Sequence, residues 1–481
     1  MKFDLELLEF VECDIEGDKL AISGSDKDLS WREFKEEVDR QKEKLLSYGL
    51  PEGHPVIIYG HKEIEFVVSI VACMSLKLPY LPIDNVFPDE RVNKIQSIVK
   101  SAVIINTSKN IIFFDDKNKN VKYFEKEDPI IYIMFTSGST GEPKGVRITH
   151  SSILDYTTWI KRDFPFSEDD IFFNQIPFSF DLSTYELFSF LMYGATIVSF
   201  SRDLITTSEH FIEKLRKYEC SVWNSTPSFL LLSLMSNDFK GETLPKLKKF
   251  FLAGEQMPHK VAKKLFSSFQ NISLYNTYGP TEVTNTSTFV EITQDILSKY
   301  KLIPVGYPKF STEIKLLNQE IENGKNIGEI QLIGNNVSIG YFNNNELNKE
   351  KFSRVNNKRA FRTGDYGYYE DGMLFFLGRR DDLVKLHGFR VETTEIDNEI
   401  MNTGNIQDVI TIPLKRGDEI IKLISFIVSA HTVDIDIIKS LIAKKLPYYM
   451  IPSDIIQIDK LPYNINHKID KKELVNIYKG M

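Results

Sequence analysis

The sequence predicts a layered α/β protein with a large N-terminal domain and a small C-terminal α+β domain. Extended and helical segments alternate between Val56 and Asn106, which is typical of parallel strands joined by helical crossovers. The length of 481 residues exceeds what one hydrophobic core usually holds, so we expect at least two domains. After the charged stretch Gly378–Arg390 the pattern changes to short strands and helices. We therefore predict domains at residues 1–380 and 381–481.

The N-terminal elements follow from local signals. Ser30 and Glu33 have the spacing of a capping box, and the amphipathic segment that follows ends near Gly49. The residues Ser108–Asn120 are rich in Lys, Asn and Asp and predict a surface connection. The alternating segments between them are expected to be extended at Val56–Tyr59, helical at Glu63–Leu76, extended at Tyr80–Ile83, helical at Asp89–Lys100 and extended at Ala102–Asn106.

Composition narrows the classes of function. The hydrophobic and charged fractions, 42% and 26%, are those of an ordinary globular protein. A formal net charge of −8 argues against a general nucleic-acid-binding role. The three cysteines, Cys13, Cys73 and Cys220, lack metal-site or CxxC spacing, so we expect free thiols in a cytoplasmic protein. No apolar run of about twenty residues and no signal-peptide core are present, so we expect no membrane insertion.

A loop rich in glycine and hydroxyl residues predicts a phosphate site. The apolar run Ile131–Phe135 predicts a buried strand, and a second β-prone run begins at Val146. The residues between them combine three glycines, four hydroxyl side chains and Lys144, which together suit an anion. An ordinary hairpin turn rarely needs all of these. The loop differs from that of P-loop NTPases, because Pro143 precedes the lysine and the chain then becomes extended instead of helical.

Three later stretches place polar groups beside predicted strands. Asp181 lies among aromatic residues, where it either caps a helix starting at Leu182 or binds a cation. The stretches Val222–Phe229 and Phe250–Glu255 each resemble a strand followed by a loop. Ligands gather at the carboxyl ends of strands in open α/β sheets, so these loops are candidate site elements.

Five motifs in this order resemble those of the adenylate-forming superfamily, and specifically of amino-acid adenylation enzymes. The resemblance covers the chain from about residue 30 to its last ten residues. The motifs are Thr136–Gly145, Asn276–Glu282, Phe361–Asp365, Gly378–Arg390 and Leu461–Leu474. The resemblance implies an ATP-dependent ligase that forms an aminoacyl-adenylate and diphosphate.

The resemblance also implies how ATP and Mg²⁺ are bound. Asp365 would bind the ribose, Arg379 would contact the nucleotide, and Glu282 would be a catalytic residue and a Mg²⁺ ligand. Lys468 would be the catalytic lysine, although His467 stands where the family usually has glycine. The β- and γ-phosphates would lie on Thr136, Ser137, Gly138, Ser139, Thr140, Gly141 and Lys144. Adenine would lie against Gly254, Glu255, Asn276, Thr277, Tyr278, Gly279 and Thr281.

For the amino acid, the resemblance implies that Asp181 pairs with the α-ammonium group. Asp381 matches the hinge about which the small, mobile domain turns, and Gly388 matches a glycine beside the phosphopantetheine arm of a carrier protein. No carrier domain follows Leu474, so we expect the carrier to be a separate protein. The pocket positions read onto this chain are Asp181, Leu182, Tyr185, Asn224, Phe251, Ala253, Thr277, Asn285 and Thr286.

Within the superfamily the chain is most similar to the ligases that activate D-alanine for a carrier protein, which makes D-alanine the first substrate to expect. Those ligases usually have cysteine where Ala253 stands and smaller apolar residues at Tyr185, Asn285 and Thr286. Buried amides need partners. These polar side chains therefore bond one another, or the substrate side chain is polar. A stand-alone enzyme of nonribosomal-peptide type for another amino acid, an acyl-CoA synthetase and a silent nucleotide-binding regulator stay open as alternatives.

Overall fold

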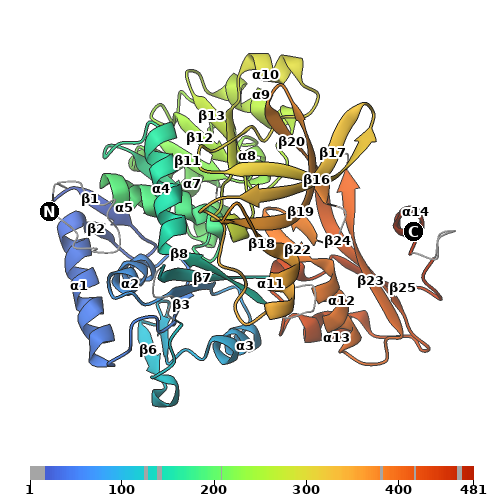
Figure 1. Cartoon of the computed structure of the whole chain (residues 1–481), viewed down its shortest axis with the longest axis horizontal. Coiled ribbons are helices and arrows are strands. Elements are labelled where there is room, and N and C mark those ends of the chain that lie inside the picture. Colours follow the sequence, from blue (N-terminus) through green and yellow to red (C-terminus); the bar gives the residue numbers. More distant parts are fainter. Residues whose placement is uncertain are drawn as a thin grey trace. The chain divides into compact units, whose positions relative to one another are not determined.

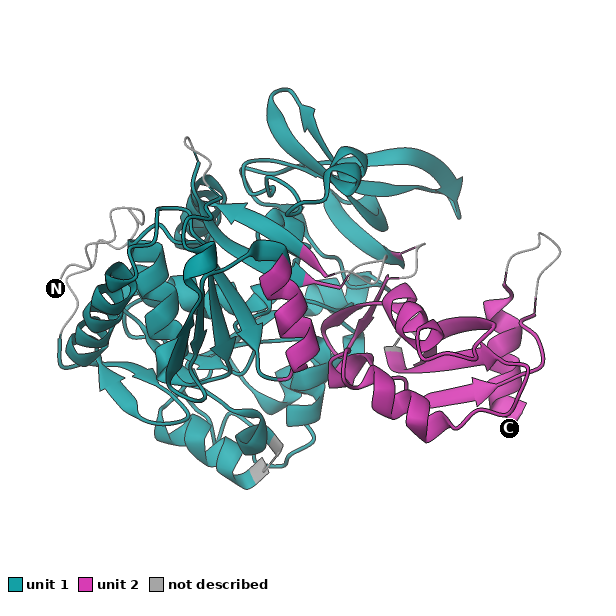
Figure 2. Ribbon diagram, turned by 90° about the horizontal axis from the view of Figure 1, so that it is seen from below, with its two compact units in different colours: residues 1–85, 98–135, 145–378 teal, residues 86–97, 136–144, 379–481 magenta. Residues whose placement is uncertain are grey.

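The computed structural model describes residues 17–123, 128–137, 143–206, 208–379, 383–416, 419–462 and 469–480 (Figure 1). The chain divides into two compact units. Unit 1 comprises residues 1–85, 98–135 and 145–378, and unit 2 comprises residues 86–97, 136–144 and 379–481 (Figure 2). Among the described residues, no helix combines the length and apolarity that crossing a membrane requires.

Unit 1 contains a mainly parallel six-stranded sheet in the order β6-β5-β3-β4-β7-β8. The alternation predicted from the sequence is confirmed, because β3 pairs in parallel with both β4 and β5. The elements of this region are β3 (Val56–Gly60), α2 (Ile64–Ser75), β4 (Tyr80–Asp84), α3 (Asp89–Val99), β5 (Val103–Asn106), β6 (Ile111–Phe114), η1 (Asp116–Asn118), β7 (Ile130–Thr136) and β8 (Lys144–Thr149).

The connection predicted at Ser108–Asn120 contains an additional strand. β6 pairs antiparallel with β5 at the edge of the sheet and is mostly exposed. Its four apolar residues favour an extended conformation. The surface position predicted for this connection agrees with the exposure of β6, and the strand itself was not predicted.

A second sheet of nine strands in unit 1 has the order β15-β14-β13-β12-β11-β9-β10-β1-β2. Within it, β10, β9, β11, β12 and β13 pair in parallel with one another, whereas β13 pairs antiparallel with β14. Its strands are β1 (Leu20–Ser23), β2 (Asp28–Ser30), β9 (Ile171–Asn174), β10 (Thr196–Ser199), β11 (Val222–Ser225), β12 (Lys249–Leu252), β13 (Ser273–Tyr278), β14 (Thr288–Glu291) and β15 (Tyr307–Pro308).

Helices and short 3₁₀ turns connect these strands. The capping box at the start of α1 is confirmed, because the Glu33 amide donates to Ser30 Oγ at 3.3 Å and the Ser30 amide donates to Glu33 Oε2 at 2.8 Å. The helical elements are α1 (Trp31–Ser47), α4 (His150–Asp163), η2 (Asp181–Ser183), α5 (Thr184–Tyr193), α6 (Arg202–Thr206), α7 (Ser208–Lys217), α8 (Pro227–Ser233), α9 (His259–Ser268), η3 (Thr281–Val283) and α10 (Gln294–Lys299).

A third sheet completes unit 1. It has the order β16-β17-β19-β18, and β20 also pairs with β19. Its elements are β16 (Glu313–Glu322), β17 (Lys325–Ile333), α11 (Asn345–Lys351), β18 (Phe352–Val355), β19 (Lys358–Glu370) and β20 (Met373–Arg379).

Unit 2 has the α+β character predicted for the C-terminal part. Two hydrophobic clusters fill it, one around Val391 and Ile396 and the other around Ile424 and Phe426. Its elements from Arg379 onward are β21 (Leu383–Leu386), β22 (Phe389–Glu392), α12 (Thr393–Met401), β23 (Asp408–Arg416), β24 (Glu419–Val428), α13 (Ile435–Ile442), η4 (Tyr448–Met450), β25 (Asp454–Gln457) and α14 (Lys471–Gly480).

The core of unit 1 explains why the parallel strands lack alternation in sequence. Val56, Ile57 and Ile58 of β3 are each fully buried, since both faces of a parallel sheet are covered. All three tryptophans, Trp31, Trp159 and Trp223, are also fully buried. The described cysteines Cys73 and Cys220 are free and buried, as predicted, and Cys13 lies outside the described residues.

Candidate active site

Adjacent strand ends bring several of the predicted site residues together. In the nine-stranded sheet, Ser225 of β11 lies beside Leu252 of β12, which lies beside Asn276 of β13. The predicted pocket residues Asn224 and Phe251 are also register partners. These strands end at the same edge, where ligands bind in open α/β sheets.

The segment after β11 differs from its prediction as a loop. Helix α8 begins at Pro227, and Thr226 is its N-cap, accepting a hydrogen bond from the Phe229 amide at 3.3 Å. Threonine followed by proline is a strong helix-start signal that was available in the sequence. The loop after β12 contains Gly254 at φ +86° and Glu255, whose Oε2 accepts from the Ser228 amide at 3.1 Å.

Asp181 is not the N-cap of helix α5. The structure places it at the start of the 3₁₀ turn η2, and α5 begins at Thr184 with Ser183 as its N-cap residue. The Asp181 carbonyl oxygen accepts a hydrogen bond from Thr184 Oγ1 at 2.6 Å. The Asp181 side chain is half-buried. This removes the capping alternative, and the role of Asp181 as the partner of an ammonium group stays a prediction.

The polar side chains of the predicted pocket bond one another, which was one of the two outcomes left open by the sequence. The Tyr185 hydroxyl and Thr286 Oγ1 are 3.1 Å apart. Asn285 Nδ2 donates to the Tyr156 hydroxyl at 3.1 Å and to Thr184 Oγ1 at 3.2 Å. Burial raises the pKa of both the Tyr156 and Tyr185 hydroxyls, so both are neutral at physiological pH.

The backbone before Thr286 is held in an unusual conformation. Thr284 and Asn285 have φ of +57° and +69°, in the left-handed region. Asparagine tolerates this region, but a β-branched threonine does so at a cost. Thr284 is fully buried, and its Oγ1 donates to the Asn336 carbonyl at 2.7 Å. Such strain persists only where the surroundings hold it, which is typical of functional sites.

The amide nitrogen of Asn224 donates two hydrogen bonds. Its Nδ2 donates to the Leu182 carbonyl and to Glu186 Oε2, each at 2.9 Å. Its Oδ1 is buried and has no hydrogen-bond partner among the described residues. Phe251 lies 5.6 Å from Tyr185 between ring centroids, so bulky side chains surround this part of the pocket.

The residues predicted for adenine and ribose are in direct contact. The Tyr278 hydroxyl donates to Asp365 Oδ2 at 2.5 Å, and both residues are almost fully buried. The Tyr278 ring also lies 5.6 Å from the Phe376 ring between centroids. Asn276 Nδ2 donates to the Pro304 carbonyl at 2.7 Å, and Thr277 Oγ1 donates to the Leu252 carbonyl at 3.4 Å.

The turn after Tyr278 requires glycine. A Cβ atom at Gly279 would lie 2.3 Å from the Asn285 carbonyl oxygen and 2.9 Å from the Ser287 amide nitrogen. Because both neighbours are backbone atoms, the site cannot relieve the overlap by turning a side chain. This close approach fixes the segment Tyr278–Thr281 against the strained segment at Asn285.

Glu282 is a buried carboxylate in the same region. It lies in η3 and is completely buried, and its Oε1 accepts a hydrogen bond from the Tyr341 hydroxyl at 2.7 Å. A hard carboxylate oxygen is a suitable Mg²⁺ ligand, and Mg²⁺ in nucleotide sites commonly takes one or two carboxylates together with phosphate oxygens. The described residues contain no group of three or more His, Cys, Asp or Glu that could hold a metal alone.

The ends of the phosphate loop are described, and its centre is not. Thr136 ends β7 and its buried Oγ1 has no hydrogen-bond partner among the described residues. Within unit 2, Ser137 Oγ donates to the Arg390 carbonyl at 3.0 Å, and Lys144 Nζ lies 3.4 Å from Glu392 Oε1. Gly138, Ser139, Thr140 and Gly141 lie outside the described residues.

The remaining predicted residues lie in unit 2. Gly388 has φ +86° in the tight turn between β21 and β22, where His387 also has positive φ. Arg379 is half-buried at the end of β20. Asp381 and Lys468, and with it His467, lie outside the described residues, so the hinge and the catalytic lysine stay predictions.

Sequence reasoning missed a buried ionic group beside the pocket. Lys62 and Glu186 are 1% and 0% exposed, and both contact Asn174 at the end of β9. Burial lowers the pKa of Lys62 and raises that of Glu186, while their mutual attraction opposes both shifts. Lys62 lies two residues after β3, and its bond to Asn174 joins the two parallel sheets, which no local sequence signal shows.

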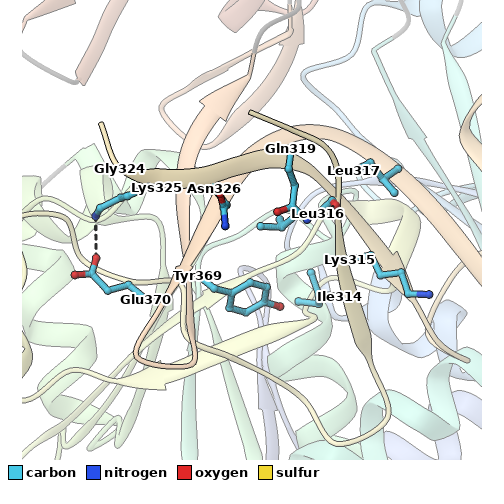
Figure 3. A pocket seen from close by; sticks show the side chains of 10 residues that line it. All are labelled: Ile314, Lys315, Leu316, Leu317, Gln319, Gly324, Lys325, Asn326, Tyr369 and Glu370. Carbon is cyan, nitrogen blue, oxygen red and sulfur yellow. Dashed lines mark hydrogen bonds and ion pairs between the residues drawn. The ribbon is translucent and has the colours of Figure 1, made fainter. Parts of the chain in front are cut away.

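Two surface pockets are separate from these residues. One of about 770 Å³ lies on β16, β17 and the end of β19, with the ion pair between Lys325 and Glu370 at its edge (Figure 3). The other, of about 390 Å³, extends from Phe289 to Met373. None of the predicted site residues lines either pocket, so the candidate site is defined by the contacts at the strand ends.

Comparison with known proteins finds a matching family model and relatives that align with almost the whole chain. The family model described as AMP-binding enzyme matches residues 11–342. The D-alanine–D-alanyl carrier protein ligase of Bacillus licheniformis is 36% identical, over 98% of this chain and 99% of the relative. The protein of the same name from Bacillus cytotoxicus is 32% identical, over 95% of this chain and 96% of the relative.

Solved structures share the fold. The adenylation domain AlmE of Vibrio cholerae, in complex with glycyl-adenosine-5′-phosphate, has a TM-score of 0.85 at 21% identity and covers 100% of this chain and 98% of that one. Holo-PA1221, a protein with adenylation and PCP domains, has a TM-score of 0.80 at 22% identity, with 95% and 81% covered. The predicted fold class is confirmed, and the chain belongs to the AMP-binding enzyme family.

Proposed function

We propose that the chain is an ATP-dependent ligase that activates an amino acid as its adenylate and transfers the aminoacyl group to the phosphopantetheine thiol of a separate carrier protein. The observation that carries this proposal is the convergence at the ends of β11 to β13. There the predicted amino-acid pocket adjoins the hydrogen-bonded pair Tyr278 and Asp365. Relatives that match almost the entire chain are named as ligases of this kind.

The nucleotide roles follow the sequence motifs. Tyr278 would stack on adenine, Asp365 would accept hydrogen bonds from the ribose, and the phosphate loop with Lys144 would hold the β- and γ-phosphates. The buried Thr136 Oγ1 at the start of that loop, which has no partner in the part of the chain that the structure describes, supports the last assignment. Glu282 would be the Mg²⁺ ligand, and the ion would neutralise phosphate charge. Arg379 would contact the nucleotide.

Catalysis would depend on positioning and charge neutralisation. The attacking carboxylate and the α-phosphate repel each other, so the protein's main task is to align them and offset their charge. Asp181 would hold the α-ammonium group, and Lys468 would lie between the carboxylate and the α-phosphate. A rotation about Asp381, at the proposed boundary between residues 1–380 and 381–481, would then bring Gly388 beside the carrier's phosphopantetheine arm.

D-alanine is the first candidate substrate, because the relatives of highest identity given above are named for it. A second candidate is another small amino acid with a polar side chain. The specific observation in its favour is the buried Asn224 Oδ1 in the predicted pocket, for which the described residues supply no hydrogen-bond donor. We further propose that the enzyme acts in the cytoplasm, where ATP is available and its buried thiols stay reduced.

The test is ATP–pyrophosphate exchange measured with the D and L enantiomers of each proteinogenic amino acid. Transfer to a phosphopantetheinylated carrier protein is measured next. We expect exchange that depends on one small group of amino acids, and covalent loading of the carrier with the same ones. Thioester formation with free coenzyme A and a non-amino carboxylic acid would instead identify an acyl-CoA synthetase. Nucleotide binding without any exchange would identify a regulator.

A further inference from the structure

A buried polar network connects the interior of unit 1 to the predicted amino-acid pocket. Lys62 Nζ donates to Asn174 Oδ1 and to the Ile176 carbonyl, each at 2.5 Å. Asn174 Nδ2 lies 3.4 Å from Glu186 Oε1, and Glu186 Oε2 accepts from Asn224 Nδ2 at 2.9 Å. Lys62, Asn174, Glu186 and Asn224 are each at least 98% buried, so solvent does not compete for these bonds.

The network determines which way the Asn224 amide faces. The two atoms that contact its nitrogen side, the Leu182 carbonyl oxygen and Glu186 Oε2, are both acceptors. A flipped amide would place Oδ1 against both of them, which is repulsive. The amide orientation is therefore set by its partners, and Oδ1 is directed away from them.

The ionised form of Glu186 favours this orientation. An ionised carboxylate only accepts hydrogen bonds, whereas a protonated one could donate to Asn224 Oδ1. Burial opposes ionisation, and the nearby Lys62 ammonium favours it. Lys62 also lies 4.4 Å from the centre of the Phe178 ring, and Asp84, Arg202 and Glu63 act on it electrostatically.

Asn224 Oδ1, which none of the described residues bonds, is an acceptor among large side chains. A buried acceptor without a partner carries a desolvation cost that a ligand donor can remove. Asn224 contacts Leu182 directly and is the register partner of Phe251, which packs against Tyr185. Bulky walls of this kind favour a short substrate side chain over a long one.

We propose that the pocket selects an amino acid whose short side chain bears a hydrogen-bond donor, a hydroxyl or a thiol, and that Asn224 Oδ1 accepts this bond. Glu186 and Lys62 are positioning residues that hold the Asn224 amide. The inference rests on the proposed function and favours its second candidate substrate class over D-alanine. Sites built to bond a substrate hydroxyl discriminate strongly against the analogue that lacks it, because the buried protein group is then left unpaired.

The experiment compares serine, cysteine and alanine of the preferred hand in pyrophosphate exchange. Wild-type protein should use serine or cysteine at least tenfold more efficiently than alanine in kcat/KM. Asn224→Leu should reduce that ratio to one or below. The matched control is Asn106→Leu, a buried asparagine at the end of β5, which should leave the ratio unchanged.

The positioning role is tested by the double variant Lys62→Met/Glu186→Gln, which removes both charges and so leaves neither buried and unpaired. A glutamine amide can donate to Asn224 Oδ1, so the serine-to-alanine ratio should fall towards one although nothing in direct contact with the substrate has changed. Because the ratio is measured on one sample, it does not depend on how much protein folds. A wild-type ratio in this variant would overturn the positioning role.

The two hypotheses fail differently. If no amino acid supports exchange, the proposed function is wrong. If exchange occurs but wild-type protein prefers alanine, or Asn224→Leu lowers alanine and serine exchange equally, the substrate inference is wrong and the proposed function stands. An equal loss of alanine and serine exchange in Asn224→Leu would be expected if a water molecule, and not the substrate, bonds Asn224 Oδ1.

Discussion

At the scale of single residues, burial changes what the sequence suggests. Lys62 and Glu186 look like ordinary surface charges in sequence, yet both are buried beside the predicted pocket. Asp181 stands among aromatic residues and is only half-buried. The chemistry of each residue therefore depends on neighbours from distant parts of the chain, which no local pattern contains.

Asp181→Ala tests the predicted partner of the substrate amine. Losing the carboxylate would leave an ammonium group unpaired in the site, at a cost of about 3 kcal/mol or more. We expect the KM for the amino acid to rise at least a hundredfold while the KM for ATP stays near the wild-type value. Steady-state kinetics with each substrate varied in turn measure both constants. Unchanged amino-acid kinetics would rule out this role.

His54 makes stability depend on pH. It is completely buried, its Nδ1 lies 2.6 Å from the Val121 carbonyl, and its Nε2 accepts from the Ala102 amide at 3.0 Å. Burial lowers the pKa of His54 below its usual value of about 6.5. As the pH is lowered, His54 therefore takes up a proton at a higher pH in the unfolded chain than in the folded one. The free energy of unfolding falls as the pH drops below the pKa of the unfolded chain.

We expect the free energy of unfolding of wild-type protein to decrease between pH 7 and pH 5, and His54→Gln to make that decrease smaller. Urea titrations at several pH values would measure it. His61 also has a pKa lowered by burial, so His61→Gln is a useful comparison. An identical pH dependence in His54→Gln and wild type would contradict the linkage.

At the scale of elements, local signals predicted α1 and the alternating strands and helices from β3 to β5, whereas contacts between distant residues determine much of the rest of unit 1. The capping box at Ser30 and the alternation from β3 to β5 were predictable because caps and hydrophobic periodicity act locally. The edge strand β6 was not, because its pairing with β5 competes with a loop-like composition. The contact between Tyr278 and Asp365 joins residues 87 positions apart, so only the fold could reveal it.

The turn after β13 offers a test of a structural glycine. Gly279→Ala would place a Cβ within 2.3 Å of a backbone oxygen, and the forced backbone shift should cost about 1–3 kcal/mol of stability. The shift should also disturb Tyr278 and weaken ATP binding. Thermal or urea unfolding and nucleotide titration would measure the two effects.

Gly241→Ala is the matched control. A Cβ at Gly241 would have its nearest neighbours at 3.6 Å, which is ordinary van der Waals contact. Its stability should stay within about 0.5 kcal/mol of wild type. If Gly279→Ala and Gly241→Ala have the same stability, the close backbone approach at Gly279 does not explain why the turn has glycine.

At the scale of the whole molecule, the chain comprises two compact units, and the proposed catalytic residues are divided between them. Tyr278, Glu282 and Asp365 belong to unit 1, whereas the positions of Asp381 and Lys468 come from sequence motifs alone. The sequence predicted the fold class and the family because its motifs are in family order. It could not identify the substrate, which depends on side-chain contacts within the pocket.

Asp381→Pro tests the proposed hinge. Proline fixes φ, so the variant should restrict rotation of the C-terminal part. We expect adenylation to stay largely intact and transfer to the carrier thiol to be blocked, because only the second step needs the rotation. Exchange and carrier loading should be measured on the same preparation. An equal loss in both steps would mean that the hinge lies elsewhere or that Asp381 supports the fold.

The most direct test of the account is amino-acid-dependent ATP–pyrophosphate exchange, compared between wild-type protein and Lys468→Ala. Loss of one preorganised electrostatic contact to the transition state should lower exchange about a hundredfold or more. Nucleotide affinity should change little, since Tyr278, Asp365 and the phosphate loop are retained. The account predicts strong exchange in wild type, which requires the amino acid, and its near loss in Lys468→Ala with ATP still bound. Equal exchange in the two proteins, or exchange that does not require an amino acid, would contradict it.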